Sequence, residues 1–192
     1  MQNSFFSMLS RMKHINRWGL MRNTWKESLS EHSMDVAAIA YGLAVIGNTR
    51  FDKKYDCNRA SVLGLYHDAS EIITGDLPTP IKYHNEEMRQ AYKKVEDVAN
   101  RALLDMLPED MMPYYQSLFI PSEQDEPLWK LVKAADKISA YIKCLEEECA
   151  GNREFSKAKQ TLLDSIMLLH LPEAELFINE FLPSFAKTLD EQ

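Results

Sequence analysis

Apolar residues recur every three or four positions along nearly the whole chain, and no long segment alternates between apolar and polar residues. This period places apolar side chains on one face of an α-helix, whereas a half-buried β-strand would repeat every second residue. With 45% apolar residues among 192, the chain can build a core without disulfides. The pattern therefore predicts an all-α fold, and the length fits a single domain over residues 1–192.

Helix-boundary signals predict about seven or eight helices that pack as a bundle. Ser28 and Glu31 have the spacing of a capping box at the start of a helix over 30–47. Further helices are expected over residues 4–15, 85–107, 128–149, 153–170 and 172–181, together with a short helix opened by Pro108.

The helix that follows 30–47 carries the most unusual residues. Asn58 is a candidate N-cap for it, and the apolar spacing from Val62 extends the predicted helix to Ile73. Gly75 stands where the residue just past a helix end commonly lies. The two prolines of the 76–80 segment then predict a rigid, non-helical loop.

The charge balance limits the choice of partners. The 22 basic and 29 acidic residues give a formal net charge of −7. A long polyanion such as DNA would be repelled by most of this surface, so no nucleic-acid polymer is expected as a partner. A small phosphorylated ligand is compatible with this charge, because one arginine and one metal ion can overcome the field locally.

The cysteines and the chain start indicate the compartment. Three cysteines, an odd number without zinc-binding spacing, favour a reducing environment. The first residues lack the apolar run of a signal peptide, and no apolar stretch approaches the ~20 residues of a membrane span. The sequence predicts a cytoplasmic protein without a membrane partner.

Ionisable residues interrupt the apolar stripes at three places. His32 lies four residues before Val36 and seven before Ile39, which puts His32 on the buried face of its helix. A single buried histidine is usually only hydrogen-bonded, so His32 alone is weak evidence for a functional site.

His67 and Asp68 lie within the apolar 62–73 segment, and Glu71 follows at helical spacing on their face. Three clustered ionisable groups would be costly to bury without a partner, and a cation at their centre removes that cost. A polar strip that faces solvent is the alternative interpretation.

Asp136 borders the apolar stripe of its helix, four residues after Val132 and eight after Leu128. A salt bridge to Lys133 is the simpler interpretation. Together with His32, His67 and Asp68, however, Asp136 completes a set of two imidazoles and two carboxylates. Mixed nitrogen and oxygen ligands suit Mn²⁺, Co²⁺, Fe²⁺ or Zn²⁺ better than Ca²⁺ or Mg²⁺, and such an ion can acidify a bound water.

The order of these residues resembles the HD superfamily of metal-dependent phosphohydrolases. Several longer sequence motifs resemble those of the bacterial HD-domain 5′-deoxynucleotidases, and the similarity extends nearly end to end. These motifs are Ile15-Asn16-Arg17-Trp18, Ser30-Glu31-His32-Ser33, Tyr66-His67-Asp68-Ala69-Ser70-Glu71, Thr74-Gly75-Asp76-Leu77-Pro78-Thr79-Pro80 and Lys133-Ala134-Ala135-Asp136.

The resemblance implies an HD-type helical bundle that hydrolyses deoxyribonucleoside 5′-monophosphates to deoxynucleoside and phosphate. It also implies a homodimer and one divalent metal ion, with Co²⁺ preferred and Mn²⁺ or Cu²⁺ as substitutes. The metal ligands would be His32, His67, Asp68 and Asp136. The substrate contacts would be Arg17, Trp18, His32, Asp68, Asp76, Leu77, Pro78 and Thr79.

Four residues receive individual roles. Glu71 is expected to orient the attacking water and carry its proton, or else to orient a metal-bound histidine. By resemblance Arg17 clamps the phosphate, although from sequence alone Arg17 is an ordinary surface residue. Trp18 would exclude a ribose hydroxyl by packing against C2′, or is simply a core aromatic. By resemblance Asp76 binds the 3′-hydroxyl, and otherwise it caps its own turn.

Two other functions compete with this one. A triphosphohydrolase or phosphodiesterase of the same superfamily could use the same metal ligands, but a triphosphate site should need more cations than Arg17 and Arg22. A non-catalytic binding module with a structural metal is the third hypothesis. Structural sites usually prefer cysteine and histidine ligands in a tetrahedral shell, which the carboxylate-rich set argues against.

Overall fold

The computed structural model of the protein describes residues 3–82, 84–120 and 122–192. Within these residues the fold is all-α, as predicted, and the only β-type pairing is an isolated bridge between Asn16 and Ser28. The described residues form ten α-helices, of which α4 and α5 have only four residues each. The helices are α1 (Phe5–Leu9), α2 (Leu29–Arg50), α3 (Cys57–Tyr66), α4 (Glu71–Thr74), α5 (Thr79–Lys82), α6 (Glu86–Leu104), α7 (Met112–Phe119), α8 (Glu126–Cys149), α9 (Ser156–Met167) and α10 (Pro172–Glu180).

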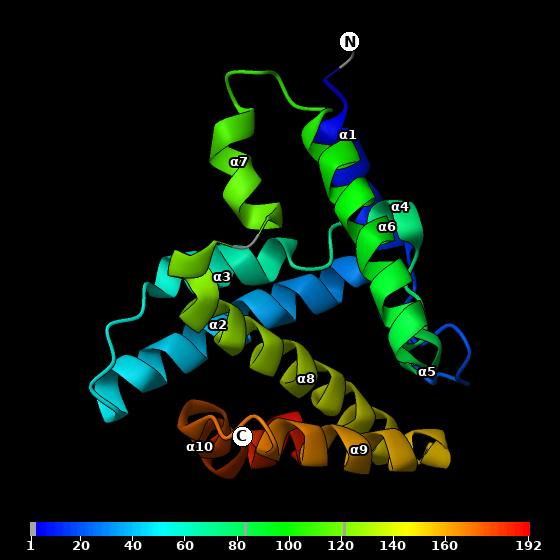
Figure 1. Ribbon diagram of the computed structural model, residues 1–192. Helices are drawn as coiled ribbons and strands as arrows, with labels where there is room; N and C mark the ends of the chain where they lie inside the picture. The colour runs from blue at the N-terminus through cyan, green and yellow to red at the C-terminus, as the bar shows by residue number, and fades with distance from the viewer. Residues whose placement is uncertain (1–2, 83, 121) are drawn as a thin grey trace.

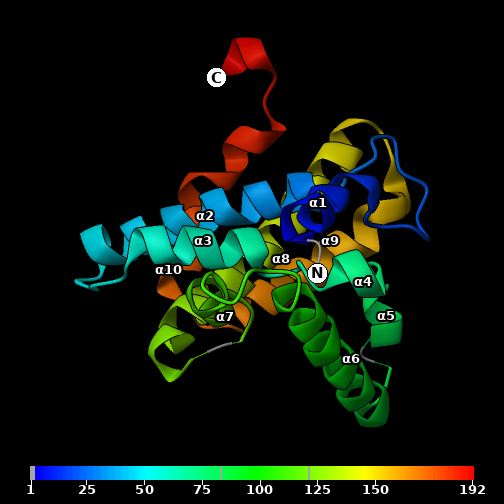
Figure 2. The same ribbon diagram turned by 90° about the horizontal axis from the view of Figure 1, so that it is seen from above.

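Helices α2 and α8 cross at the centre of the bundle (Figure 1). Helix α3 runs beside α2 in both views, while α9 packs along α8 (Figure 2). The central core includes fully buried aliphatic side chains: Leu43 from α2, Leu63 from α3 and Leu131 and Ile138 from α8. Removal of these side chains from water is the main source of stability, at roughly 1.5–3 kcal/mol for each large side chain.

The predicted capping box of α2 is present: Ser28 accepts from the Glu31 backbone, and Glu31 accepts from the Ser28 backbone. Two other predicted helix starts are displaced. Helix α3 is capped by Asp56, whose side chain accepts from the Arg59 backbone N–H, so Asn58 was the wrong cap. Both residue types cap equally well, and only the extended backbone at Asp56 decides between them. Helix α7 begins at Met112, after a turn that contains the proline predicted to open it.

The predicted helix through 62–73 is interrupted. Helix α3 ends at Tyr66, and the backbone hydrogen bonds over the next turns join residues three apart, such as Ala69 N–H to Tyr66 O and Glu71 N–H to Asp68 O. This tighter spacing is that of a 3₁₀ turn. The Gly64 carbonyl, which Asp68 would use in an α-helix, instead accepts from Nδ1 of His67.

None of the described helices combines the length and the apolar character that a bilayer crossing requires.

Candidate active site

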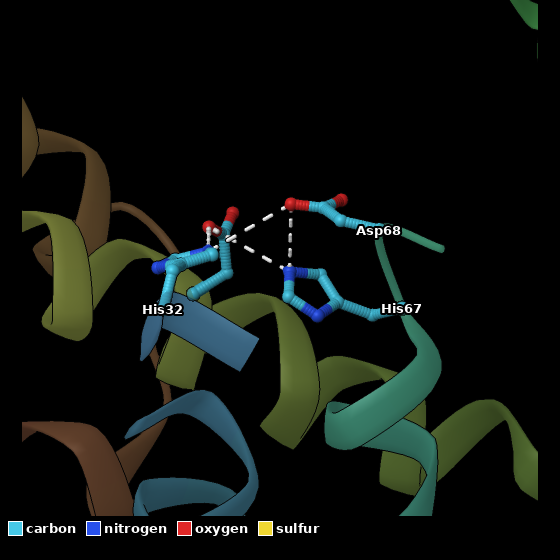
Figure 3. Close-up of side chains that lie close together, drawn as sticks. His32, His67 and Asp68 are labelled. Carbon is cyan, nitrogen blue, oxygen red and sulfur yellow. Dashed lines mark ion pairs between the residues drawn. The ribbon is translucent and has the colours of Figure 1, made fainter. Parts of the chain in front are cut away.

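Three parts of the fold bring together the four predicted metal ligands. His32 comes from the first turns of α2, His67 and Asp68 from the turn after α3, and Asp136 from the middle of α8. One nitrogen or oxygen atom from each of the four side chains lies within 4.8 Å of the other three. His32, His67 and Asp68 point toward one another (Figure 3). The cluster therefore sits where the two central helices meet the end of α3.

The close approach of α3 to α2 sets the spacing between the histidines. A Cβ atom on Gly64 would lie 3.0 Å from the Ala37 Cα, so a side chain at this position would push the two backbones apart. The turn that follows then directs His67 Nε2 to 3.0 Å from Asp68 Oδ2. His32 Nε2 lies 3.7 Å from the same oxygen and 3.2 Å from Asp136 Oδ1.

Both histidines are held through Nδ1. His67 Nδ1 lies 2.7 Å from the Gly64 carbonyl, which can only accept, so the proton of a neutral His67 is on Nδ1. His32 Nδ1 lies 3.0 Å from Ser139 Oγ. Both Nε2 atoms are buried and have no hydrogen-bond partner among the described residues. Metal-binding histidines are oriented in this way, with one nitrogen anchored and the other free for the ion, so the donor set fits a divalent cation.

Burial differs between the nitrogen and oxygen donors. The His32 side chain is fully buried and that of His67 is 8% exposed, whereas Asp68 is 21% and Asp136 38% exposed. The carboxylates therefore form the side of the cluster that a water or substrate can reach.

The charges of the cluster strongly perturb one another. Burial lowers the pKa of His67, but the adjacent Asp68 carboxylate outweighs burial and raises that pKa to about 9. Burial raises the pKa of Asp68 and of Asp136, and the facing histidines more than reverse this, so both pKa values fall below the usual range of a carboxyl. Both carboxylates are therefore ionised at neutral pH and supply two negative charges to the cluster.

Glu71 opens the short helix α4 and is only 3% exposed. Burial, followed by the negative charge of Asp68, raises the pKa of Glu71 to about 8, although Lys82 opposes the shift. Its Oε1 lies 3.2 Å from Lys82 Nζ, and its Oε2 has no hydrogen-bond partner among the described residues. Glu71 is therefore close to the charge of Asp68 as predicted, although the two residues do not share a continuous helix.

Arg17 and Trp18 lie on the loop that precedes α2. Arg17 Nη1 is 3.5 Å from Asp68 Oδ2, which places the guanidinium beside the metal cluster. Trp18 packs edge-on against Phe155 and donates from Nε1 to Glu27. Sequence reasoning missed Glu27, which also accepts from Arg17 Nε, because nothing in a loop glutamate distinguishes it from a solvated one.

The far side of this loop is fastened to the end of α8 by Glu147, which is fully buried. Its carboxylate accepts from the backbone N–H groups of Thr24 and Trp25 and from the side chains of Lys143 and Asn152. Burial alone would raise the pKa of Glu147, but these donors lower it to about 2. The loop that carries Arg17 is thus tied to α8 through Thr24 and Trp25.

The proline-containing segment is a loop only over residues 75–78, because α5 begins at Thr79. Gly75 ends α4 with a positive φ of 73°, as predicted for a residue after a helix. Asp76 lies near enough to contribute to the raised pKa of Arg17 and of Glu71. Leu77 and Pro78 are half-buried beside it, whereas the predicted contact from the Thr79 side chain lies outside the part that the structure describes.

A family model for YfbR-like 5′-deoxynucleotidases matches residues 4–185. The chain belongs to this family. The chain is therefore a 5′-deoxynucleotidase, as the resemblance implied.

Curated relatives of this YfbR-like chain carry the same activity in their names. A 5′-deoxynucleotidase of Pectobacterium atrosepticum is 47% identical over 190 residues, which cover 99% of this chain and 96% of that protein. A 5′-deoxynucleotidase of Yersinia pseudotuberculosis is 48% identical over 187 residues, which cover 97% of this chain and 95% of that protein.

Solved structures support the fold of the YfbR-like chain. An HD-domain phosphohydrolase of Listeria innocua superposes with a TM-score of 0.83 at 24% identity, covering 95% of this chain and 88% of that one. The HD phosphohydrolase of cyanophage S-2L, whose structure holds dA and one catalytic Zn²⁺, has a TM-score of 0.66 at 18% identity, with 98% and 100% coverage. At these identities the likeness concerns the fold alone.

Proposed function

We propose that this YfbR-like 5′-deoxynucleotidase binds one divalent cation through His32, His67, Asp68 and Asp136 and hydrolyses deoxyribonucleoside 5′-monophosphates at that site. The observation that carries the proposal is the pair of buried Nε2 atoms, neither hydrogen-bonded among the described residues, that converge with two ionised carboxylates. When bound, the cation supplies an acidified water and offsets the charge that develops on the phosphoryl group. The products are the deoxynucleoside and inorganic phosphate.

The donor set also bears on the metal. Two neutral imidazoles and two carboxylates favour a borderline first-row ion, and the two negative charges offset a 2+ ion. Four protein ligands leave positions free in an octahedral shell. We take Co²⁺ as the preferred ion, with Mn²⁺ or Cu²⁺ as substitutes, and metal-stimulated turnover across a series of chloride salts tests this order.

Arg17 binds the phosphate in this proposal. The nearby carboxylates of Asp136, Asp68 and Glu27 outweigh the effect of burial and raise the pKa of Arg17, so its positive charge is permanent. The described contacts of its guanidinium use Nε and Nη1, and a guanidinium has five N–H donors. The remaining donors suit a phosphate that lies between Arg17 and the metal ligands His32 and Asp68.

Glu71 takes the proton from the attacking water. The Nδ1 positions of His32 and His67 are occupied by Ser139 and by the Gly64 carbonyl, which argues against the alternative that Glu71 orients a histidine. The unpartnered Oε2 of Glu71 is a suitable acceptor for that proton.

The sugar is recognised by the residues on either side of the cluster. Trp18 forms a wall against C2′ that a ribose hydroxyl would meet, and Asp76 accepts from the 3′-hydroxyl. Leu77, Pro78 and Thr79 complete the nucleoside pocket, and the fixed backbone of the proline-containing segment limits the entropy lost on binding. Few base-specific contacts are expected, so several bases should be accepted.

Replacing Trp18 with alanine should let AMP react. The wall at C2′ is removed, so the preference for dAMP over AMP in kcat/KM should fall by about 10- to 100-fold, the range in which one substrate group is discriminated. Trp25→Ala is the matched control, because Trp25 is a 64% exposed tryptophan of the same loop. An unchanged preference in Trp18→Ala, measured with both nucleotides under one metal concentration, would contradict the steric account.

Metal binding should release a proton from His67. Because its pKa in the metal-free protein is about 9, His67 is protonated at pH 7 and must lose that proton to bind an ion. The apparent affinity for Co²⁺ should therefore weaken about tenfold for each pH unit below 9. Calorimetry at pH 7 in two buffers of different ionisation enthalpy measures the released proton, and no release would contradict this assignment.

Phosphate release from dAMP, with and without Co²⁺, tests the proposed function directly. We expect metal-stimulated release from dAMP and weak activity on dATP. Fast release of a polyphosphate product from dATP would instead favour the triphosphohydrolase. Retained metal without turnover of either substrate would favour the non-catalytic module.

Residues 1–192 act in this proposal as one domain, in a cytoplasmic homodimer. Exposed apolar side chains near the chain end, including Leu168, Phe181 and Phe185, support self-association. Sedimentation equilibrium tests this assembly, and a monomer mass at micromolar concentration would contradict it.

A further inference from the structure

Glu27 connects the two side chains that face the substrate. Its Oε2 lies 3.2 Å from Arg17 Nε and 2.8 Å from Trp18 Nε1, so one carboxylate oxygen accepts from both. The side chains of Glu27 and Arg17 are only 10% and 11% exposed. Hydrogen bonds to an ionised acceptor in such a shielded place are stronger than those at an open surface.

The backbone alone already closes the loop that carries these residues. Asn16 and Ser28 form an antiparallel bridge, and the Arg17 N–H donates to the Glu27 carbonyl at 2.9 Å. The Leu29 N–H donates to the Ile15 carbonyl at 2.8 Å. Because these bonds fix the two ends of the loop, the side-chain bonds of Glu27 are left to set the orientation of Arg17 and Trp18.

Trp18 needs such a restraint. Its φ of 58° lies in the left-handed region, which is unfavourable for a residue with a large side chain. A conformation of this kind persists when its surroundings determine it more than once. The bond to Glu27 and the edge-on packing against Phe155, at 5.3 Å between ring centroids, hold the indole in one position.

Arg17 needs the Glu27 carboxylate in addition to that of Asp68. Its guanidinium lies between Glu27 and Asp68, and Asp136 and Asp76 also attract it. Without Glu27 the guanidinium would be drawn fully toward Asp68, one of the proposed metal ligands. Glu27 holds Nε and so keeps the other N–H groups in place beside the metal cluster.

We propose that Glu27 is a positioning residue that fixes the phosphate clamp Arg17 and the sugar wall Trp18 as one unit, and thereby links turnover to the choice of deoxyribose. The proposal rests on the proposed function, in which Arg17 and Trp18 contact the substrate. Loss of Glu27 should affect both properties together, because a single oxygen controls both side chains.

Glu27→Met tests the proposal by removing the acceptor while keeping the length of the side chain. We expect kcat/KM for dAMP to fall about 100-fold, as for a misplacement near 1 Å, with the dAMP-to-AMP ratio falling as well. Bound Co²⁺ should stay at the wild-type level. Glu27→Gln should recover most of the ratio, because its amide oxygen can accept both bonds without the charge.

A spectroscopic reading separates positioning from general stability. The chain has three tryptophans, so its ¹H–¹⁵N spectrum contains three indole N–H signals, and Trp18→Phe identifies the one from Trp18. That signal should move in Glu27→Met and stay near its wild-type position in Glu27→Gln. Glu27→Asp, which withdraws the carboxylate by one methylene, should resemble Glu27→Met and serves as the second variant if the methionine variant does not fold.

Glu154→Met is the matched control, because Glu154 pairs with Arg22 of the same loop and, among the described residues, has no hydrogen bond or ion pair with Arg17 or Trp18. It should keep the dAMP-to-AMP ratio and the Trp18 signal. Wild-type turnover and an unmoved Trp18 signal in Glu27→Met would overturn the role of Glu27. A wild-type protein without dAMP hydrolysis would instead overturn the proposed function itself.

Discussion

Asp68→Ala should lose both the bound metal and the hydrolysis of dAMP. Asp68 Oδ2 lies 3.0 Å from His67 Nε2, 3.7 Å from His32 Nε2 and 3.5 Å from Arg17 Nη1. This oxygen is thus the shared neighbour of both histidines and of the phosphate clamp. Loss of a residue that only supports a metal ligand commonly costs 10- to 100-fold, so loss of a direct ligand should lower kcat/KM by more than about 100-fold.

The metal content of Asp68→Ala distinguishes this explanation from a loss of substrate binding alone. Elemental analysis after dialysis against Co²⁺ should find the variant depleted, whereas loss of the Arg17 contact by itself would leave the metal bound. Asp110→Ala is the control, since Asp110 is an exposed aspartate outside the cluster. Cobalt-stimulated turnover at the wild-type level in Asp68→Ala would show that Asp68 is not a ligand.

The same variant should change the titration of His67. The Asp68 carboxylate is the main group that raises the pKa of His67 against the effect of burial. Without that carboxylate, burial dominates, and the pKa of His67 in the metal-free protein should drop well below 9. The electrostatic coupling is therefore measurable even where no metal is bound.

Helical spacing correctly predicted the burial of the site residues that lie on long helices, although the choice of Asp136 as a ligand also depended on the family resemblance. The buried position of His32 follows from helical spacing in α2, and its side chain is fully buried. Asp136 was placed at the edge of the α8 stripe, and its 38% exposed side chain agrees. A long, continuous helix has a fixed period, so the face of each residue can be counted along the chain.

The orientation of the site residues that lie in turns could not be predicted from helical spacing. His67 and Asp68 were expected on one continuous helix, but the bond from His67 Nδ1 to the Gly64 carbonyl accompanies a tighter turn. Side chains that hydrogen-bond to the backbone compete with helical hydrogen bonds, and the spacing of apolar residues does not reveal this competition.

Glu27 and Glu147 were missed for a related reason. The partners of Glu27 are 9 and 10 residues away, and the backbone N–H groups that donate to Glu147 are more than 120 residues away, across contacts that exist only in the folded chain. A buried glutamate cannot be distinguished from a solvated one in the sequence. The role of such a residue can be recognised only when its hydrogen-bond donors are known.

Glu71→Gln should abolish most turnover while leaving the metal bound. Glutamine preserves the size of the buried side chain but cannot accept the proton of the attacking water, and loss of a general base typically costs 10²- to 10⁴-fold in rate. Because Glu71 is not one of the four proposed ligands, cobalt content should stay at the wild-type level. Together these readings separate proton transfer from metal binding.

The pH dependence gives a further signature of Glu71. A general base must be ionised, and the pKa of Glu71 in the metal-free protein is about 8. Activity should therefore rise with pH on the acid side, and a bound cation, which favours the ionised form, should move this rise below pH 8. The residual activity of Glu71→Gln should lack the same rise.

Glu96→Gln provides the matched control for Glu71→Gln. Lys82 Nζ lies 3.2 Å from Glu71 Oε1 and 3.2 Å from Glu96 Oε1, so each substitution removes one of the two carboxyl groups beside the same lysine. Only Glu71 has an unpartnered buried oxygen and a pKa raised by the charge of Asp68. If Glu96→Gln lost as much activity as Glu71→Gln, the common cause would be Lys82, and Glu71 would not be the base.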